Sequence, residues 1–182
     1  MTVTLSFVHP SLMQPVALSF RFLFFSLATM SAAGASAQAL PAGVRLGMTA
    51  DDLRVAAPDV ARVARPARLA GGLAGTWRGA PSPIAGLAFE PTYFFAGNVL
   101  QRVEWMRAAD DLADRGAGAF AELLQWGRAQ FGAETASRDP GSAYASWSTD
   151  DTDIYLQHVD GAGHATVRLV YKTRQRKDAS ML

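Results

Sequence analysis

The sequence predicts an α+β fold of two tandem helix-plus-antiparallel-meander units, with the helices packed on one face of the sheet. Three observations lead to this prediction. A short helix pattern with a good N-cap opens the first unit near residue 50, and a longer apolar stripe at helical spacing opens the second near residue 117. Strand-like runs separated by turn residues follow each helix. The shared element order, at a spacing of roughly 70 residues, indicates an internal repeat.

Residues 1–39 are typical of a cleaved signal peptide. Arg21 precedes an apolar run, and small residues then lead to A-x-A cleavage sites after Ala37 or Ala39. The apolar run is shorter than the roughly 20 residues that a spanning helix needs. We therefore expect cleavage, no stable membrane insertion afterwards, and a periplasmic or secreted protein. Met13 is an alternative start to Met1, because it leaves a more conventional basic region before the apolar run.

The composition excludes several classes of function. All 16 acidic residues and every basic residue except Arg21 lie after the cleavage sites, so acidic and basic residues balance in the remaining chain. No net charge therefore attracts nucleic acid or an anionic membrane. Cysteine is absent, which excludes disulfides, thiolate metal sites, cysteine nucleophiles and a lipidated N-terminal cysteine.

The first unit is expected over residues 40–107. Thr49 is a good N-cap, acidic residues fill the first helical turn, and Pro58 ends the helix. Weak strands are expected over 60–69 and 73–78, around a Gly-Gly break.

A hairpin is expected to complete this unit, with strands over 87–95 and 99–107 around the three-residue turn 96–98. Pro91 places the first of these strands toward a sheet edge. The expected register gives one apolar face, made of Phe89, Tyr93, Phe95, Val99, Val103 and Trp105. The other face carries Arg102 and Glu104 together with Phe94, Leu100 and Met106.

The second unit is expected over residues 117–172, after a polar connector at 108–116. Its helix runs over 117–131 and ends at Gly132, and Gly127 on the apolar stripe allows another element to approach closely. A turn is expected at 138–141. Strands are expected over 144–148, 154–159 and 165–172, followed by a basic tail over 173–182.

Two patterns resemble those of small exported bacterial proteins. One is Gly43-x-x-x-Gly47-Met48-Thr49-x-x-Asp52-Leu53, and the other is Tyr93-x-Phe95-x-x-x-x-Leu100-x-x-Val103. Such domains are similar to the outer-membrane assembly lipoproteins of the SmpA/OmlA type and to tandem-repeat β-lactamase inhibitor proteins. The resemblance implies a non-catalytic envelope module that binds through a sheet face. The chain departs from the assembly lipoproteins because it lacks the lipidated cysteine.

No motif for catalysis, a metal or a cofactor is found, and we expect none of these. His158 and His164 are predicted on opposite faces of the last hairpin, so they cannot share a metal. The segment Thr149-Asp150-Asp151-Thr152-Asp153 holds three carboxylates but lacks the calcium-loop pattern, so a turn is favoured. Neither a nucleophile elbow nor a phosphate-binding loop is present.

The predicted function is binding of an envelope protein through an exposed sheet face. Tyr144, Tyr155 and Arg168 are expected to point away from the core, and Tyr and Arg are enriched in binding surfaces. Trp77 and Trp126 are the tryptophans best placed to contact a partner, since the other two are expected in the core.

Two alternatives stay open. A small periplasmic hydrolase would bring together at least two of five dispersed residues, namely Glu90, Glu104, Asp110, Asp153 and His158. A ligand-carrying domain would show a cavity behind Phe120 and Leu124.

Overall fold

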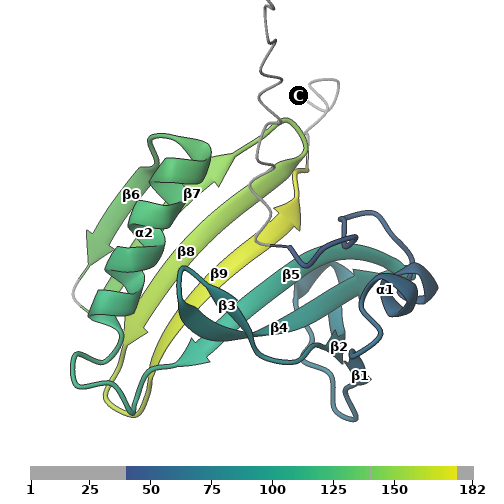
Figure 1. Cartoon of the computed structure of the whole chain (residues 1–182), viewed down its shortest axis with the longest axis horizontal. Coiled ribbons are helices and arrows are strands. Elements are labelled where there is room, and N and C mark those ends of the chain that lie inside the picture. Colours follow the sequence, from purple (N-terminus) through teal and green to yellow (C-terminus); the bar gives the residue numbers. More distant parts are fainter. Residues whose placement is uncertain (1–39, 140, 176–182) are drawn as a thin grey trace, which may run out of the picture. The chain divides into compact units, whose positions relative to one another are not determined.

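The computed structural model describes residues 40–139 and 141–175, whose main feature is one antiparallel sheet (Figure 1). The strand order is β1-β2-β4-β5-β9-β8-β7-β6, and β3 pairs with β4 beside this path. The strands are β1 (Ala61–Arg62), β2 (Ala74–Arg78), β3 (Ser82–Ile84), β4 (Leu87–Ala96), β5 (Val99–Ala108), β6 (Thr135–Asp139), β7 (Ser142–Ser148), β8 (Thr152–Asp160) and β9 (Ala165–Thr173). The predicted signal peptide and residues 176–182 of the predicted tail lie outside the described residues.

The helices are α1 (Ala50–Ala56), α2 (Ala117–Phe131) and the short 3-10 helix η1 (Ala70–Gly72). The Thr49 side chain accepts a hydrogen bond from the backbone N–H of Asp52, and the Asp52 side chain accepts one from the backbone N–H of Thr49. This reciprocal capping box fixes the start of α1, as the sequence indicated. Helix α2 covers the predicted residues and ends at Gly132, whose φ of 84° suits glycine.

The predicted α+β fold of two helix-plus-meander units is wrong, because the structure is mostly one large antiparallel sheet. Strand β5 pairs with β9 from Arg102↔Lys172 to Ala108↔Thr166, so strands from both halves form one sheet. Strand residues greatly outnumber helical ones, and α1 is only 7 residues long. Pairing β5 with β9 is physically favoured because it removes two long edges that separate meanders would leave open to solvent.

The hairpin β4–β5 also differs from its predicted register. Its turn is the two-residue Gly97–Asn98, both with positive φ, rather than a three-residue turn. Phe94 pairs with Arg102 but Phe95 pairs with Leu100, so Gln101 forms a bulge. The bulge turns Leu100 to the core, where it is fully buried, although the simple alternation placed it on the outer face.

Several short strands depart from the sequence prediction. The region 60–69 contains only the two residues of β1, whereas β3 and β6 were not predicted, and β6 includes part of the predicted turn 138–141. Strand β4 lies inside the sheet despite Pro91. Pro91 is tolerated there because β3 pairs with 87–89 and β2 pairs with 92–95, which leaves the proline in the gap between the two neighbours.

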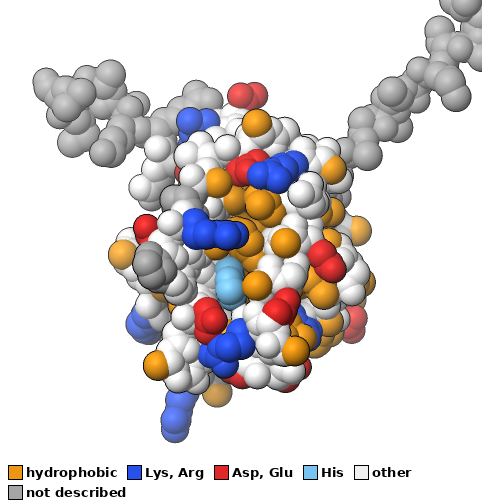
Figure 2. Space-filling model, turned by 90° about the vertical axis from the view of Figure 1, so that its left-hand side faces the viewer, with side chains coloured by type: hydrophobic (Ala, Val, Ile, Leu, Met, Phe, Trp, Pro, Cys, Tyr) orange, Lys and Arg blue, Asp and Glu red, His pale blue; other side chains and the backbone are white. Residues whose placement is uncertain are grey.

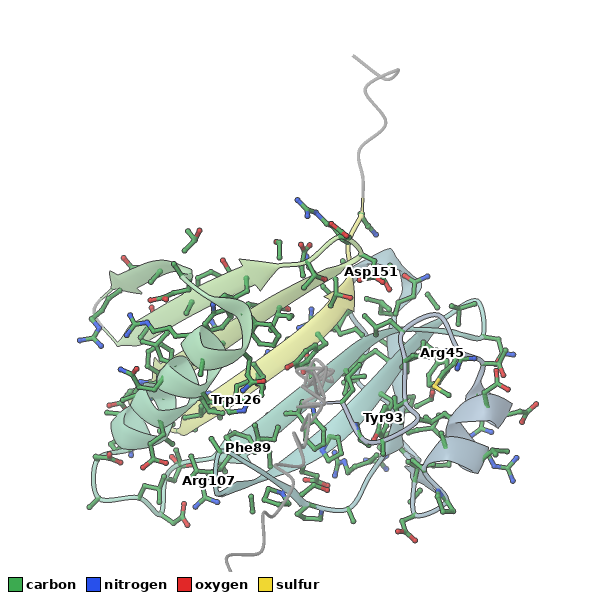
Figure 3. The ribbon with its side chains drawn as sticks, turned by 45° about the horizontal axis from the view of Figure 1, so that its top comes forward. Arg45, Phe89, Tyr93, Arg107, Trp126 and Asp151 are labelled. Atoms are coloured by element: carbon green, nitrogen blue, oxygen red, sulfur yellow. The ribbon has the colours of Figure 1, made fainter. Side chains whose placement is uncertain are left out.

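One face of the sheet is covered by α1, the segment 40–48, β3 and α2 (Figure 3). We call this the covered face. Its buried side chains form one continuous core that joins both halves of the chain, including Phe89, Tyr93 and Trp105 from the first half and Leu156 and Leu169 from the second. Burial raises the pKa of Tyr93 to about 12.

Helix α2 contacts the sheet most closely at Gly127. A Cβ atom at this position would lie 2.5 Å from Cη2 of Trp147 on β7. The Trp147 indole N–H donates to the carbonyl of Gly132 at 3.0 Å, so the same side chain also holds the end of the helix. The predicted close approach at Gly127 is therefore present, with Trp147 as the neighbour.

Within residues 40–139 and 141–175, neither α-helix has the length and apolar character needed to cross a membrane.

Candidate binding surface

The opposite face of the sheet has no helix over strands β5, β9, β8 and β7, and we call this region the open face (Figure 1). Strand alternation and the observed register determine which side chains point there. They are Arg102, Glu104 and Met106 from β5, Arg168, Val170 and Lys172 from β9, Asp153, Tyr155 and Gln157 from β8, and Tyr144 and Ser146 from β7.

The centre of the open face is buried although no helix covers it. Val170 is fully buried, and its two neighbours across the strands are Glu104 and Tyr155. The Arg102 Nε donates to Glu104 Oε1 at 2.8 Å, and the Arg102 guanidinium lies 5.2 Å from the centroid of the Tyr155 ring. Burial raises the pKa of Tyr155, and the Arg102 charge opposes this shift. These polar side chains thus form an ordered layer over Val170.

A hollow of about 460 Å³ lies next to this layer on the open face. Its walls include Tyr144, Ser146, Tyr155, Gln157 and Lys172. Tyr144 is 37% exposed, and its ring centroid lies 6.0 Å from that of Tyr155. The two tyrosines therefore make an aromatic wall that solvent, or a partner, can reach.

Arg168 is the one basic side chain of the open face, within the described residues, that forms no ion pair with an acidic residue. It lies between Gln157 and Met106 in the register of the sheet. Its Nε is buried and has no hydrogen-bond acceptor in the described part of the chain. Met106 beside it is 41% exposed. An unneutralised guanidinium next to exposed apolar surface is suited to an acidic group on a binding partner.

The structure brings together three of the five residues predicted to bind. Tyr144, Tyr155 and Arg168 share the open face, whereas Trp77 and Trp126 pack against the core on the covered face. Trp77 lies on β2 with the Arg54 guanidinium 5.9 Å from its ring centroid. Trp126 contacts Phe131 edge to face, at 5.7 Å between ring centroids, and is partly exposed.

The five residues of the hydrolase alternative are dispersed over the structure. The carboxylates of Glu90, Glu104, Asp110 and Asp153 each lie next to a different basic partner, which is Arg78, Arg102, Arg115 and Lys172 respectively. His158 lies on the covered face, opposite to Glu104 and Asp153. Five hollows, of about 300, 270, 460, 280 and 230 Å³, each have at most one of the five residues on their walls.

Hollows are present beside Phe120 and Leu124, between α2 and strands β6 and β7. They measure about 270 Å³ and 230 Å³ and share Phe120, Arg138 and Ala143 on their walls. Figure 2 shows hydrophobic side chains and a histidine on this side of the molecule, between groups of basic and acidic side chains. His158 Nε2 lies 2.8 Å from the carbonyl oxygen of Arg115, which it can only approach as a donor.

Residues 149–151 form the turn between β7 and β8, and Thr152 and Asp153 begin β8. Thr149 and Thr152 close it through backbone and side-chain hydrogen bonds, and Asp153 accepts a hydrogen bond from Ser148 at 2.9 Å. In the described part of the chain, no group of three His, Cys, Asp or Glu residues could hold a metal ion.

Sequence reasoning missed two neighbours of Arg168 on the open face and one strand on the covered face. Met106 and Gln157 were not singled out, because their position beside Arg168 depends on pairing between β5, β9 and β8. Strand β3 was missed because its turn, Ala85–Gly86, places an alanine at positive φ, where glycine or asparagine is the usual signal.

Comparisons of this chain with protein-family models, curated proteins and solved structures found no match.

Proposed function

We propose that this protein is a non-catalytic binding module that contacts a protein partner through the open face. The partner would be an envelope or extracellular protein, since residues 1–39 have the pattern of an export signal. The observation that carries the proposal is Arg168, whose buried Nε has no acceptor and whose charge has no acidic counterpart among the described residues.

The surroundings of Arg168 support a protein partner. Arg102 is held by its ion pair with Glu104 and lies over the Tyr155 ring, so these side chains have little entropy left to lose when a partner binds. Tyr144 and Met106 offer exposed apolar area on either side. Tyrosine, arginine and methionine are the residue types enriched in the centres of protein interfaces.

The chemistry of the surface defines the expected partner. A carboxylate on the partner would pair with Arg168, and an apolar or aromatic side chain would enter the hollow of about 460 Å³ beside Tyr144 and Tyr155. Binding is then by surface complementarity, and no bond is made or broken.

The test is affinity capture from an envelope extract, followed by titration of the captured protein. Wild-type chain is compared with Arg168→Gln and Tyr144→Ser, both on the open face. Arg65→Gln, in an exposed loop just after β1, which lies at the opposite end of the strand order from β7, is the matched control. We expect the wild type and the control to capture the same protein, and each open-face variant to bind it at least about tenfold more weakly.

Equal capture by all four chains would refute the open-face assignment. A partner that loses affinity with Arg65→Gln but not with Arg168→Gln would also refute it, because binding would then occur elsewhere.

A further inference from the structure

A hollow of about 280 Å³ on the covered face lies beside the end of α1. The turn 57–60, which follows α1, makes one of its walls. The connection between β2 and β3, together with Pro91 and Tyr93 of β4, makes another, and residues 41 and 42 complete it. Most of these residues are alanine or proline, so the walls are mainly apolar.

The hydroxyl of Tyr93 faces this hollow. Tyr93 is 1% exposed and lies on the walls (Figure 3 labels Tyr93). A Cβ atom at Gly79 would lie 3.4 Å from Tyr93 Oη and 2.8 Å from Pro91 Cγ, and both Gly79 and Pro91 are wall residues. Unlike the indole N–H of Trp105, the hydroxyl is not closed off from solvent, and it forms no hydrogen bond with any described residue. A molecule in the hollow can therefore reach it.

Asp59 is the one charged residue on these walls, within the part of the chain that the structure describes. Its side chain is exposed in the turn 57–60 and makes no ion pair or hydrogen bond with another described residue. The other hollows with charged walls differ, because each also contains a basic residue, Arg138 or Lys172. The charge of this hollow thus favours a cation and disfavours an anion.

We propose that this hollow binds a primary alkylammonium group, with the Asp59 carboxylate as counter-charge and the Tyr93 hydroxyl oxygen as hydrogen-bond acceptor. An ammonium group has three donors, so it can serve both oxygens and a water molecule at once. Its alkyl chain would lie against the alanine and proline walls, which removes apolar area from water. The site is separate from the open face and does not depend on the function proposed for that face.

The test compares probes that share one alkyl chain but differ in the head group, namely n-butylammonium, 1-butanol and butyrate. Each is titrated into the full chain at neutral pH, and the backbone N–H signals of Ala57 and Gly79 are followed by nitrogen–proton correlation NMR. We expect butylammonium to bind about fivefold more tightly than butanol, because exposed ion pairs contribute at most about 1 kcal/mol. Butyrate should leave both signals unchanged.

Substitutions identify the groups that bind the ammonium. Asp59→Asn should abolish the preference for butylammonium over butanol. Asp139→Asn is the matched control, because Asp139 is exposed on β6, at the opposite end of the strand order from β1, and makes no ion pair with a described residue. Tyr93→Phe keeps the ring but removes the acceptor, so butylammonium should bind about threefold more weakly.

The ammonium could be supplied by a free amine or by a lysine side chain of a protein, and a fourth probe, N-acetyl-lysine methylamide, separates the two. Binding at least as tight as that of butylammonium assigns the site to a protein lysine. Weaker binding assigns it to a free amine.

The proposal is refuted if butylammonium leaves the Ala57 and Gly79 signals unchanged, or if butanol binds as tightly. It is also refuted if Asp139→Asn alters the preference as much as Asp59→Asn does. These readouts use the wild type and exposed substitutions, so they hold even if Tyr93→Phe fails to fold.

Discussion

The two faces of the sheet bury side chains by different means. On the covered face, helices and β3 lie over aromatic and aliphatic residues, and the core gains stability by removing apolar area from water. On the open face, Val170 is equally buried, but its cover is an ion pair and a tyrosine ring. The comparison shows that a sheet face without a helix can still be ordered, because charged side chains with apolar stems pack over its centre.

The difference matters for the proposed function. Apolar side chains under a helix are unavailable to a partner, whereas the polar layer presents rigid tyrosine and arginine side chains to solvent. A binding surface therefore requires the layer to be as firmly held as the core, which the following substitutions test.

The largest effect is expected from removing apolar volume on the two faces. Leu156→Ala, under α2, should lower the free energy of unfolding by about 2–5 kcal/mol, since it leaves a cavity in a core that cannot collapse. Val170→Ala removes fewer carbons and should cost about 2 kcal/mol, because the ordered side chains over it leave the space unfilled. Urea unfolding measures both values. An equal cost per lost carbon would show that the polar layer is as rigid as the core.

Breaking the ion pair of the open face should have the next largest effect. Glu104→Gln leaves the Arg102 guanidinium partly buried without its carboxylate, and about 3 kcal/mol of stability should be lost. The double variant Arg102→Met with Glu104→Met should recover most of this loss in chemical denaturation. If the single variant is as stable as wild type, the pair does not order the layer.

On the covered face, the contact between α2 and β7 gives a smaller expected effect. Gly127→Ala places a Cβ 2.5 Å from the Trp147 ring and should cost about 1–3 kcal/mol. The higher helix propensity of alanine, about 1 kcal/mol, offsets part of this strain. The double variant Gly127→Ala with Trp147→Phe lacks the ring atoms that clash. In thermal unfolding it should therefore lose less stability than the sum of the losses of the two single variants. If the two losses simply add, the strain does not come from this contact.

The smallest effect concerns pH at the start of α2. Hydrogen bonds from the backbone N–H groups of Gly118 and Gly116 lower the pKa of Asp114 below its usual 3.8. A lowered folded pKa means that this stabilisation is complete above the unfolded pKa and is lost as the pH falls through the folded one. Asp114→Asn should therefore flatten the loss of stability below about pH 4 in an acid titration followed by circular dichroism. An unchanged profile would show that Asp114 is not the source of the loss of stability at low pH.

Local signals accounted for much of the fold. The capping box at Thr49, the bounds of α2, and the outward positions of Tyr155 and Arg168 depend on residues close together in the sequence. The pairing of β5 with β9 depends on residues 58 to 70 positions apart, for which one sequence holds no direct signal. This long-range pairing converts the expected two units into one sheet.

The proposed binding surface was predictable to the same extent. Alternation along β8 and β9 placed Tyr155 and Arg168 on the outer face. It could not show that Met106 lies next to Arg168, because that depends on the pairing of β5 with β9. The hollow at the Tyr93 hydroxyl could not be anticipated either, because it depends on which distant segments surround the ring.

The pairing of β5 with β9 also sets the order in which the chain can fold. Strand β5 is complete at Ala108, but its partner ends at Thr173 and is therefore among the last described segments to be synthesised. A sheet closed by such distant contacts forms slowly, because the chain between β5 and β9 must be brought into place first. Until then the β5 edge has no partner and can pair with another chain. A truncation before β9 should consequently yield an aggregating chain rather than a smaller folded domain.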